Sequence, residues 1–252
     1  MASEAISEHE LDLALASELQ AALLPKACPH DCPHQVAAAR NRMCFGVGGD
    51  FYDFLRLNED QFALVIGDVV GHGVRASLVM AQIMGFFRSG RQKRSRPTEI
   101  ISGLNEMLIE LGDRIGAVVP CSIFYVVVDL PTGICFYINA GHHQPILCER
   151  TGGGVKPFGS ASILLGVEEF DGEEMCHTFL PGERLVLYTD GIIETSAPDG
   201  EKFGLKRLRN LVSNSAGDTP DELADTALDA LDEFRAGLVQ EDDQTIVVVD
   251  RI

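Results

Sequence analysis

Aspartate residues stand at the edges of four apolar, strand-like runs of the sequence, each beside a glycine or a second acid. The segments are GVGGDFYDF (Asp50, Asp53), VIGDVVGHG (Asp68), LVLYTDGIIE (Asp190) and QEDDQTIVVV (Asp242, Asp243). A single aspartate near glycine is usually a turn residue, but four such sites beside predicted core strands are harder to explain as turns. Two carboxylates about 4 Å apart repel by about 4 kcal/mol at an effective dielectric constant near 20, so converging acids require a cation.

The chemistry of these donors favours a hard divalent cation. Oxygen ligands, with few histidines or cysteines among them, suit Mg²⁺ or Mn²⁺ better than Zn²⁺. Two ions that share a bridging carboxylate could activate water for in-line attack on a phosphate ester. The aspartates therefore predict a two-metal hydrolytic site, provided that the fold brings them together.

Hydrophobic periodicity predicts the elements that must position these acids. It predicts helices over 5–24, 74–90, 97–111, 203–213 and 220–235, and strands over 35–40, 51–57, 61–67, 121–129, 134–139, 145–149, 173–180, 184–189 and 245–250. Short turns between strands favour largely antiparallel sheets, and the last four helices form two pairs. We expect one α+β domain in which helix pairs cover the sheets.

Composition excludes several classes of protein. The chain has 252 residues, 46% of them apolar, and no run approaches the roughly 18 apolar residues of a membrane span. Its acidic N-terminus lacks the pattern of a secretory signal, and the net charge of −18 argues against a nucleic-acid or anionic-membrane surface. Seven cysteines, mostly in apolar runs, are interpreted as reduced thiols, which predicts a cytoplasmic protein.

Five motifs carry a resemblance to a known family. GGDFYD, GDVVGHG, NAGHHQP, YTDGIIE and EDDQTIVVV, in this order, resemble the PPM metal-dependent serine/threonine phosphatases, and most closely their SpoIIE/RsbU-type bacterial branch. The resemblance extends from about Leu23 to Ile252. It implies an αββα sandwich, with two stacked, mainly antiparallel sheets flanked by helix pairs. It also implies two Mn²⁺ or Mg²⁺ ions and the hydrolysis of phosphoserine or phosphothreonine.

The resemblance assigns roles to individual residues. The implied metal ligands are Asp50, Asp68, the backbone carbonyl of Val69, Asp190 and Asp242, with Asp68 bridging the two ions. Asp243 is included with less weight, because relatives often have asparagine there. Asp53 is expected to serve a turn or a supporting hydrogen bond rather than to bind metal.

His72 is the histidine that we assign as general acid toward the leaving serine or threonine oxygen, since its ordinary pKa lies near working pH. It could equally fit only the glycine-rich turn before a helix. Asn139, Gly141 and His142 are expected to shape a turn near the site, and Glu194 to orient a loop.

Eukaryotic members of the superfamily hold the substrate phosphate with an N-terminal arginine, which has no clear counterpart in this sequence. Arg40 and Arg42 lie upstream of the first acid motif, but either could be a strand-edge residue. The phosphate could then be held at the metal centre without an arginine.

The resemblance also implies partners. The substrate would be a phosphorylated STAS-type anti-anti-sigma protein in a partner-switching pathway that controls transcription. Residues 1–24 resemble the segment that, in relatives, couples an upstream sensory domain to the catalytic unit, here residues 25–252. The leucine stripe of this helix would pair with a second copy of the chain, or would pack on its own domain.

A basic run and a Cys/His run stand out from the rest. The run at 88–97 contains Arg88, Arg91, Lys93, Arg94 and Arg96, which form either a solvated loop or a docking site for an acidic partner. CPHDCPHQ contains Cys28, His30, Cys32 and His34, a composition that suits Zn²⁺; its prolines favour an extended connector instead.

Two rival functions remain. A diguanylate cyclase would explain GGDFYD, but Phe51 replaces the second acid of the cyclase signature and the later aspartates would have no role. A non-catalytic docking module that keeps the phosphatase fold is the other alternative. The presence of all four acid motifs argues against it.

Overall fold

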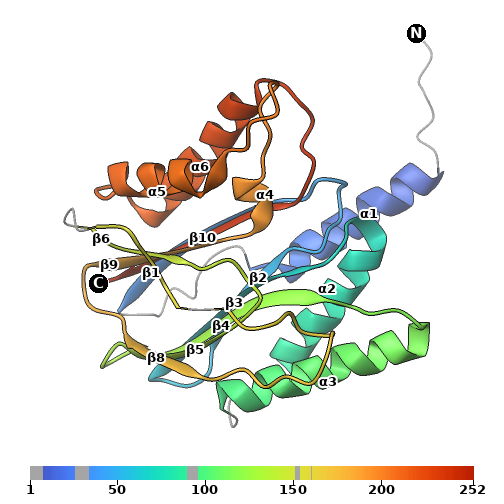
Figure 1. Cartoon of the computed structure of the whole chain (residues 1–252), viewed down its shortest axis with the longest axis horizontal. Helices are drawn as coiled ribbons and strands as arrows, with labels where there is room; N and C mark the ends of the chain where they lie inside the picture. The colour runs from blue at the N-terminus through green and yellow to red at the C-terminus, as the bar shows by residue number, and fades with distance from the viewer. Residues whose placement is uncertain (1–7, 26–33, 90–95, 151–153, 160) are drawn as a thin grey trace.

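The computed structural model describes residues 8–25, 34–89, 96–150, 154–159 and 161–252. Its strands form two antiparallel sheets of five strands each (Figure 1). The first sheet has the order β1 (Gln35–Arg42), β10 (Gln244–Arg251), β9 (Glu183–Tyr188), β6 (Ile146–Glu149) and β7 (Lys156–Pro157). The second has the order β2 (Phe51–Arg56), β3 (Gln61–Val69), β4 (Cys121–Asp129), β5 (Ile134–Ala140) and β8 (Met175–Thr178).

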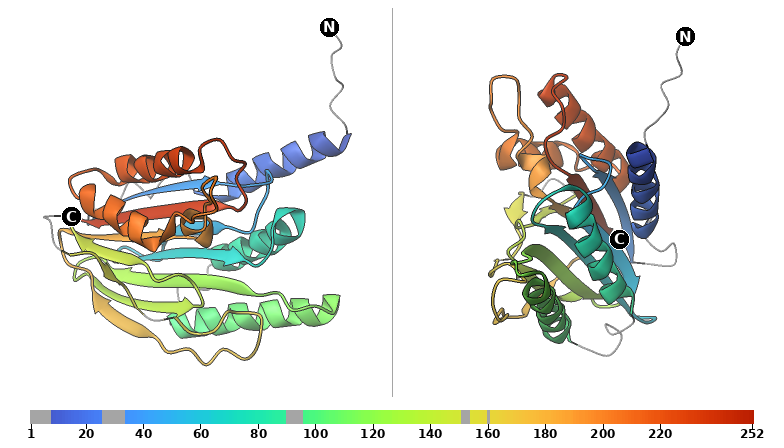
Figure 2. Two further views of the ribbon diagram at one scale, coloured as in Figure 1. Left: turned by 45° about the horizontal axis from the view of Figure 1, so that its top comes forward. Right: turned by 90° about the vertical axis from the view of Figure 1, so that its right-hand side faces the viewer.

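Helices cover the outer faces of the stacked sheets. Figure 2 shows the first sheet beneath α5 (Gly204–Asn214) and α6 (Pro220–Arg235), and the second sheet above α3 (Pro97–Ile115). Helix α2 (Gly73–Arg88) packs against β2 and β3 of the second sheet. The remaining helices are α1 (Glu8–Leu23) and the single turn α4 (Asp190–Ile193). The predicted αββα sandwich of the α+β class is confirmed. No helix in the ranges given above combines the length and hydrophobicity that crossing a membrane requires.

Alternation along the strands explains why the sheets are covered on both faces. In β10, Val247 and Val249 belong to the core between the sheets, whereas Ile246 and Val248 pack in the cluster under α5 and α6. Successive side chains of a strand point to opposite faces, so an apolar run of this kind must be buried on both.

Most predicted elements match the observed ones to within a few residues, and the differences concern ends and short pieces. Strand β3 continues to Val69, so Asp68 lies inside the strand and pairs with Ser122 of β4. The predicted strand 173–180 is shorter, and neither α4 nor β7 was predicted. Elements this short leave too few residues for a periodic pattern.

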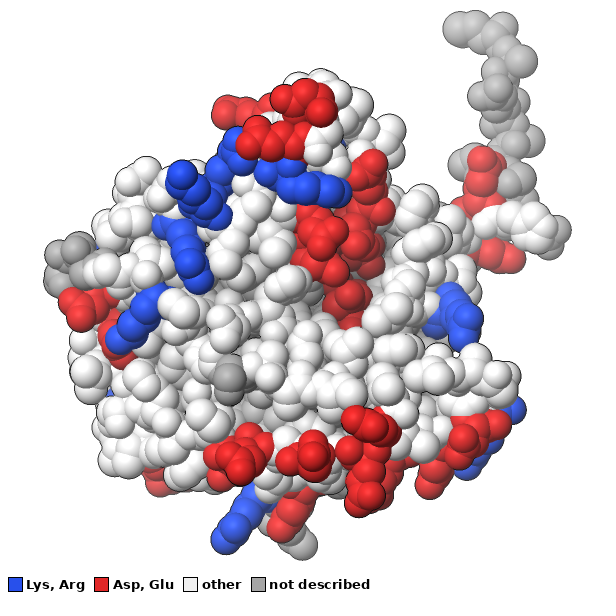
Figure 3. All heavy atoms as spheres, in the orientation of Figure 1, with Lys and Arg blue, Asp and Glu red and all other residues white. Residues whose placement is uncertain are grey.

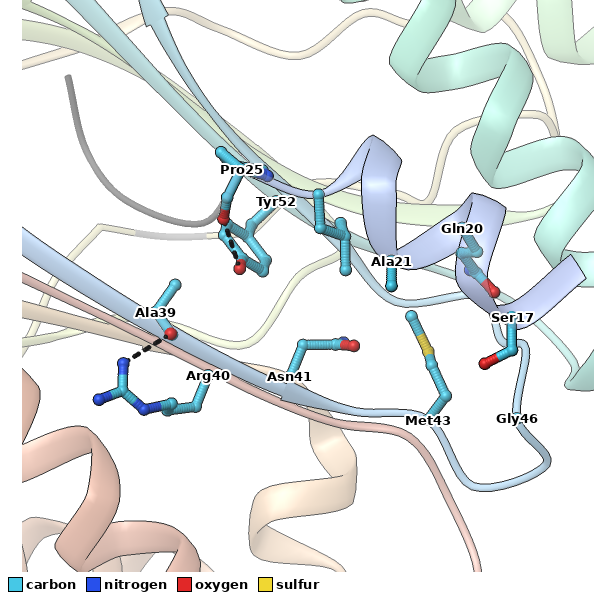
Figure 4. Close-up of a pocket in the computed structure, with 11 residues that line it drawn as sticks. Ser17, Gln20, Ala21, Pro25, Ala39, Arg40, Asn41, Met43, Gly46 and Tyr52 are labelled. Carbon is cyan, nitrogen blue, oxygen red and sulfur yellow. Dashed lines mark hydrogen bonds between the residues drawn. The ribbon is translucent and has the colours of Figure 1, made fainter. Parts of the chain in front are cut away.

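Helix α1 lies beside the sandwich and is fastened to it by hydrogen bonds. The Gln20 side chain donates to the Gly48 carbonyl at 2.8 Å and accepts from the Gly48 amide at 3.0 Å. Where the chain leaves α1, the Tyr52 hydroxyl donates to the Pro25 carbonyl at 2.9 Å (Figure 4). A cavity of about 500 Å³ remains between α1 and β1, with Asn41 and Met43 pointing from the strand toward the helix.

We predict that Gln20→Ala lowers the free energy of unfolding by about 1–3 kcal/mol, because it leaves two buried backbone groups of Gly48 without partners. Urea denaturation measures this effect. The matched control is Glu18→Ala, an exposed change on the same helix, which should cost less than about 0.5 kcal/mol. Equal denaturation midpoints for the two variants would contradict the attachment.

Candidate active site

The acids of the four motifs meet at one end of the sandwich. Asp50 precedes β2, Asp68 lies near the end of β3, Asp190 opens α4, and Asp242 and Asp243 precede β10. Figure 3 shows acidic side chains gathered in the middle of this face. Four segments far apart in the sequence therefore contribute carboxylates to one place.

The pKa values of these acids show that they interact. Burial, reinforced by the charges of Asp190, Asp242 and Asp243, raises the pKa of Asp68 to about 8. Burial and the charge of Asp68 raise the pKa of Asp50 well above its usual value. Burial and the charge of Asp242 raise the pKa of Asp190. Each acid thus makes it harder for its neighbours to ionise.

Asp50 is held by one of its two carboxylate oxygens. Its Oδ2 accepts hydrogen bonds from the hydroxyls of Thr189 at 2.7 Å and Thr245 at 2.5 Å. Thr189 follows β9 and Thr245 lies near the start of β10, so the two threonines fix the residue that precedes β2 of the second sheet against the first sheet. Since both hydroxyls use Oδ2, Oδ1 remains available to a ligand within the described part of the chain.

Gly49 has no side chain, and this leaves room for two of the predicted ligand oxygens. A Cβ atom at this position would lie 2.5 Å from the Val69 carbonyl oxygen and 3.0 Å from Asp68 Oδ1. Any larger residue would therefore displace these oxygens. At the other side of the site, a Cβ at Gly191 would lie 1.9 Å from the Asp243 carbonyl oxygen, so only glycine lets α4 approach β10 this closely.

Asp242 and Asp243 are neighbours with different environments. Asp243 is buried, and its carboxylate accepts from the backbone amides of Cys44 and Gly49, both at 2.8 Å. Burial raises its pKa, and these amides oppose the rise. Asp242 is exposed beside the other acids. The geometry therefore gives Asp243 a part in holding the Gly49–Asp50 segment and leaves Asp242 accessible to a cation.

The donor set fits a hard divalent cation, although the side chains do not converge on a single point. Among the residues that the structure describes, no group of three His, Cys, Asp or Glu side chains is arranged to hold a metal ion. Neighbouring carboxylates repel one another when no cation lies between them, and their raised pKa values show that these acids are within electrostatic range. All donors in this cluster, including the Val69 carbonyl, are oxygens, as Mg²⁺ and Mn²⁺ prefer.

Two histidines, His72 and His143, are relevant to the site, and sequence reasoning identified only His72. His72 is exposed at the start of α2, where its ring lies 4.8 Å from that of Phe45. His143 acts directly on the acids, because its charge lowers the pKa of Asp190. The ring of His143 stacks on Tyr188 at 5.8 Å. The second histidine of NAGHHQP was the signal that could have identified it.

The other residues of NAGHHQP build the support of the site, as expected. Asn139 Oδ1 accepts from the His142 amide at 2.8 Å, and His142 Nδ1 lies 2.9 Å from the hydroxyl of Ser122. Burial lowers the pKa of His142 to about 3, so its ring is neutral. Ser122 in turn pairs with Asp68 across β3 and β4.

Arg40 and Arg42, which were singled out in the sequence, form ion pairs with helix α6. Arg40 binds Asp221 and Asp225 of α6, and Arg42 binds Asp232 of the same helix. Both residues therefore fasten β1 to α6.

The structure describes two residues of the basic run, Arg88 at the end of α2 and Arg96 before α3. Arg88, the last residue of the 16-residue helix α2, lies about 22 Å along the helix axis from Gly73. Its Nε donates to Asp53 Oδ2 at 2.7 Å, so Asp53 is the buried half of an ion pair. Arg96 caps α3. Arg91, Lys93 and Arg94 lie outside the described residues, as do Cys28, His30 and Cys32 of the Cys/His run.

Comparison with known proteins agrees with the motifs. The family model of Stage II sporulation protein E (SpoIIE) matches residues 58–252. Protein IcfG of Synechocystis sp. is 28% identical over 274 residues, which cover 96% of this chain and 42% of IcfG. Phosphoserine phosphatase RsbU of Bacillus subtilis is 22% identical over 248 residues, 97% of this chain and 71% of RsbU. The chain thus spans less than half the length of IcfG.

Solved structures share the fold. The SiaA-PP2C domain of Pseudomonas aeruginosa superposes with a TM-score of 0.83 at 21% identity, over 97% of both chains. RsbX, solved in complex with magnesium, superposes with a TM-score of 0.65 at 15% identity, over 87% of this chain and 96% of RsbX. The SpoIIE model matches well over half of the 252 residues, and the chain therefore belongs to the SpoIIE family.

Proposed function

We propose that this chain hydrolyses phosphoserine or phosphothreonine in a protein substrate, with two Mn²⁺ or Mg²⁺ ions bound at the acid cluster. The observation that supports this most is the raised pKa of Asp68, to about 8, caused by burial and by three neighbouring acids. Acids that resist ionisation because they repel one another can bind divalent cations, whose charge removes the repulsion. The relative RsbU is named a phosphoserine phosphatase, which supports this reaction class.

Each residue of the site then has a part. Asp50, Asp68, Asp190, Asp242 and the Val69 carbonyl would hold the cations. Thr189 and Thr245 orient Asp50, and Asp243 orients the Gly49–Asp50 segment. When bound, divalent cations supply the Lewis acidity that polarises a phosphoryl group and generates a nucleophile from water near neutral pH.

Protonation of the leaving oxygen requires an acid at the mouth of the site. His72 remains the residue assigned from the sequence. His143 is a second candidate, because its charge reaches Asp190 and its ring is oriented by Tyr188. Either imidazole could hold the proton that the departing serine or threonine oxygen takes up.

The partners follow from the same resemblance. We propose a phosphorylated STAS-type protein as substrate, within a partner-switching pathway in the cytoplasm. Residues 1–24 would couple an upstream sensory domain or activator to the catalytic unit. The exposed residues Leu11, Leu15 and Leu19 on α1 support pairing with a second copy. The basic run would dock an acidic partner, although its described member Arg88 is already paired with the buried Asp53.

We predict that Asp68→Asn and Asp190→Asn each lower the hydrolysis of p-nitrophenyl phosphate with Mn²⁺ by at least about 10³-fold, because the cations contribute several kcal/mol to catalysis. Asp171→Asn, an exposed change, is the control and should retain full activity. A wild-type chain as inactive as the two variants would instead favour the non-catalytic docking module.

We predict that stabilisation by Mg²⁺ depends on pH. The pKa of Asp68 is raised from its unfolded value to about 8, so the metal-free protein loses stability as pH rises through this interval. A cation must displace the bound proton at pH 6 but not at pH 8.5. Thermal unfolding should therefore show a larger gain in Tm with Mg²⁺ at pH 8.5 than at pH 6. An equal gain at both pH values would be inconsistent with this coupling, and Asp68→Asn should remove most of the difference.

We predict that substitution of Asp243 lowers stability, whereas substitution of its neighbour Asp242 weakens metal binding. Asp243→Asn places an amide donor against the Gly49 or Cys44 N–H group, so the free energy of unfolding should fall by about 1–3 kcal/mol. Asp242→Asn should leave stability within about 0.5 kcal/mol while weakening Mn²⁺ binding. Urea denaturation and isothermal titration calorimetry measure the two quantities. The reverse pattern would reassign the ligand to Asp243.

A further inference from the structure

An uncharged surface adjoins the acid cluster on the same face of the molecule. Figure 3 shows few charged side chains between the central acids and the acidic rim on the α3 side, although the chain carries a net charge of −18. We call the exposed apolar residues beside the site the platform; they are Val70 (57% exposed), Ile115 (51%), Val118 (58%), Ile163 (38%) and Val167 (45%). Apolar residues gathered next to a site commonly mark a contact with another molecule.

The platform contains a hollow. Val118 and Val167 line a cavity of about 320 Å³, and the other lining residues are Ile109, Gly112, Asp113, Gly116, Ala117 and Gly166. This space can receive an apolar side chain of a partner, the kind of anchor on which protein interfaces depend.

Buried contacts hold the platform in one conformation. The Asn105 side chain, 2% exposed on α3, accepts from the Gly166 amide at 2.7 Å and donates to the Glu168 carbonyl at 2.9 Å. Leu165 exchanges backbone hydrogen bonds of 3.0 and 2.9 Å with Cys121. A Cβ at Gly166 would lie 2.1 Å from the Val119 carbonyl oxygen, so this close approach requires glycine. A surface fixed in this way loses little conformational entropy on binding.

The platform is continuous with the strand ends that carry the proposed ligands. Cys121 pairs with Val69, and the Val70 amide donates to the Pro120 carbonyl at 3.0 Å. A folded protein that places a phosphorylated side chain at Asp68 must therefore cover the adjoining platform. Because the acidic chain repels a phosphorylated acidic partner, uncharged apolar contacts are the suitable source of affinity there.

We propose that Val70, Val118 and Val167, with their hollow, dock a folded phosphoprotein substrate through an apolar side chain beside its phosphorylated residue. This docking rests on the proposed function, and it places the specificity for protein substrates in the platform. Hydrolysis of a small phosphate ester should therefore not depend on the platform.

The test compares Val118→Asp and Val167→Asp with Leu180→Asp, an equally exposed control. Leu180 lies at the opposite end of the sheet from the platform. The amide of the preceding residue, Phe179, donates to the Gly133 carbonyl, and Gly133 follows the end of β4. The nine residues of β4 place that end about 27 Å from Cys121. Substrates are a serine-phosphorylated STAS-domain protein from the same organism and p-nitrophenyl phosphate. Binding of the phosphoprotein is measured separately by biolayer interferometry, and circular dichroism verifies folding.

We expect both platform variants to lower kcat/KM for the phosphoprotein at least tenfold, through KM, and to weaken its binding equally. Hydrolysis of p-nitrophenyl phosphate should stay within twofold, and the control should match wild type in every assay. Platform variants that bind and hydrolyse the phosphoprotein like wild type would overturn the proposal. So would folded variants that lose p-nitrophenyl phosphate hydrolysis to the same extent.

Binding separates this proposal from the proposed function. A wild-type chain that binds the phosphoprotein but hydrolyses neither substrate refutes the phosphatase activity. In that case, weaker binding by the platform variants would still support docking. A wild-type chain that does not bind the phosphoprotein overturns the docking surface, whatever its activity toward p-nitrophenyl phosphate.

Discussion

Repulsion among acids held close together is the constraint on which the rest of this structure depends. Burial and neighbouring charges raise the pKa values of Asp50, Asp68 and Asp190, so assembling them opposes folding at neutral pH. The hydroxyls of Thr189 and Thr245 offset part of this cost at Asp50. Divalent cations would neutralise the remaining repulsion among the acids, which is a reason for oxygen donors to gather at one end of the sandwich.

The two-sheet architecture makes this assembly possible. Asp68 comes from the second sheet, whereas Thr189 and Thr245 come from the ends of strands in the first, so the acids meet only when the sheets stack. The core between the sheets, with residues such as Leu187 and Val247, fixes that stacking. Folding and formation of the site are therefore one process, and mutations in the core between the sheets will disturb both.

The sequence predicted the elements and the acids because both leave local signals. Alternating apolar residues mark the strands, and aspartate beside glycine marks their ends. Interactions between distant segments left no such signal. Examples are the hydrogen bonds of Gln20 with Gly48 and of Asn105 with Gly166, and the effect of His143 on the pKa of Asp190. Periodicity also does not show which distant side chains meet, so it could not predict the ion pair between Arg88 and Asp53.

Anomalous diffraction from a crystal soaked in Mn²⁺ would show whether the acids bind cations. We predict two manganese peaks between Asp68 and Asp190, one of them also bound by the Val69 carbonyl oxygen. A map without manganese at these acids, from crystals soaked near pH 8 where Asp68 can ionise, would contradict it.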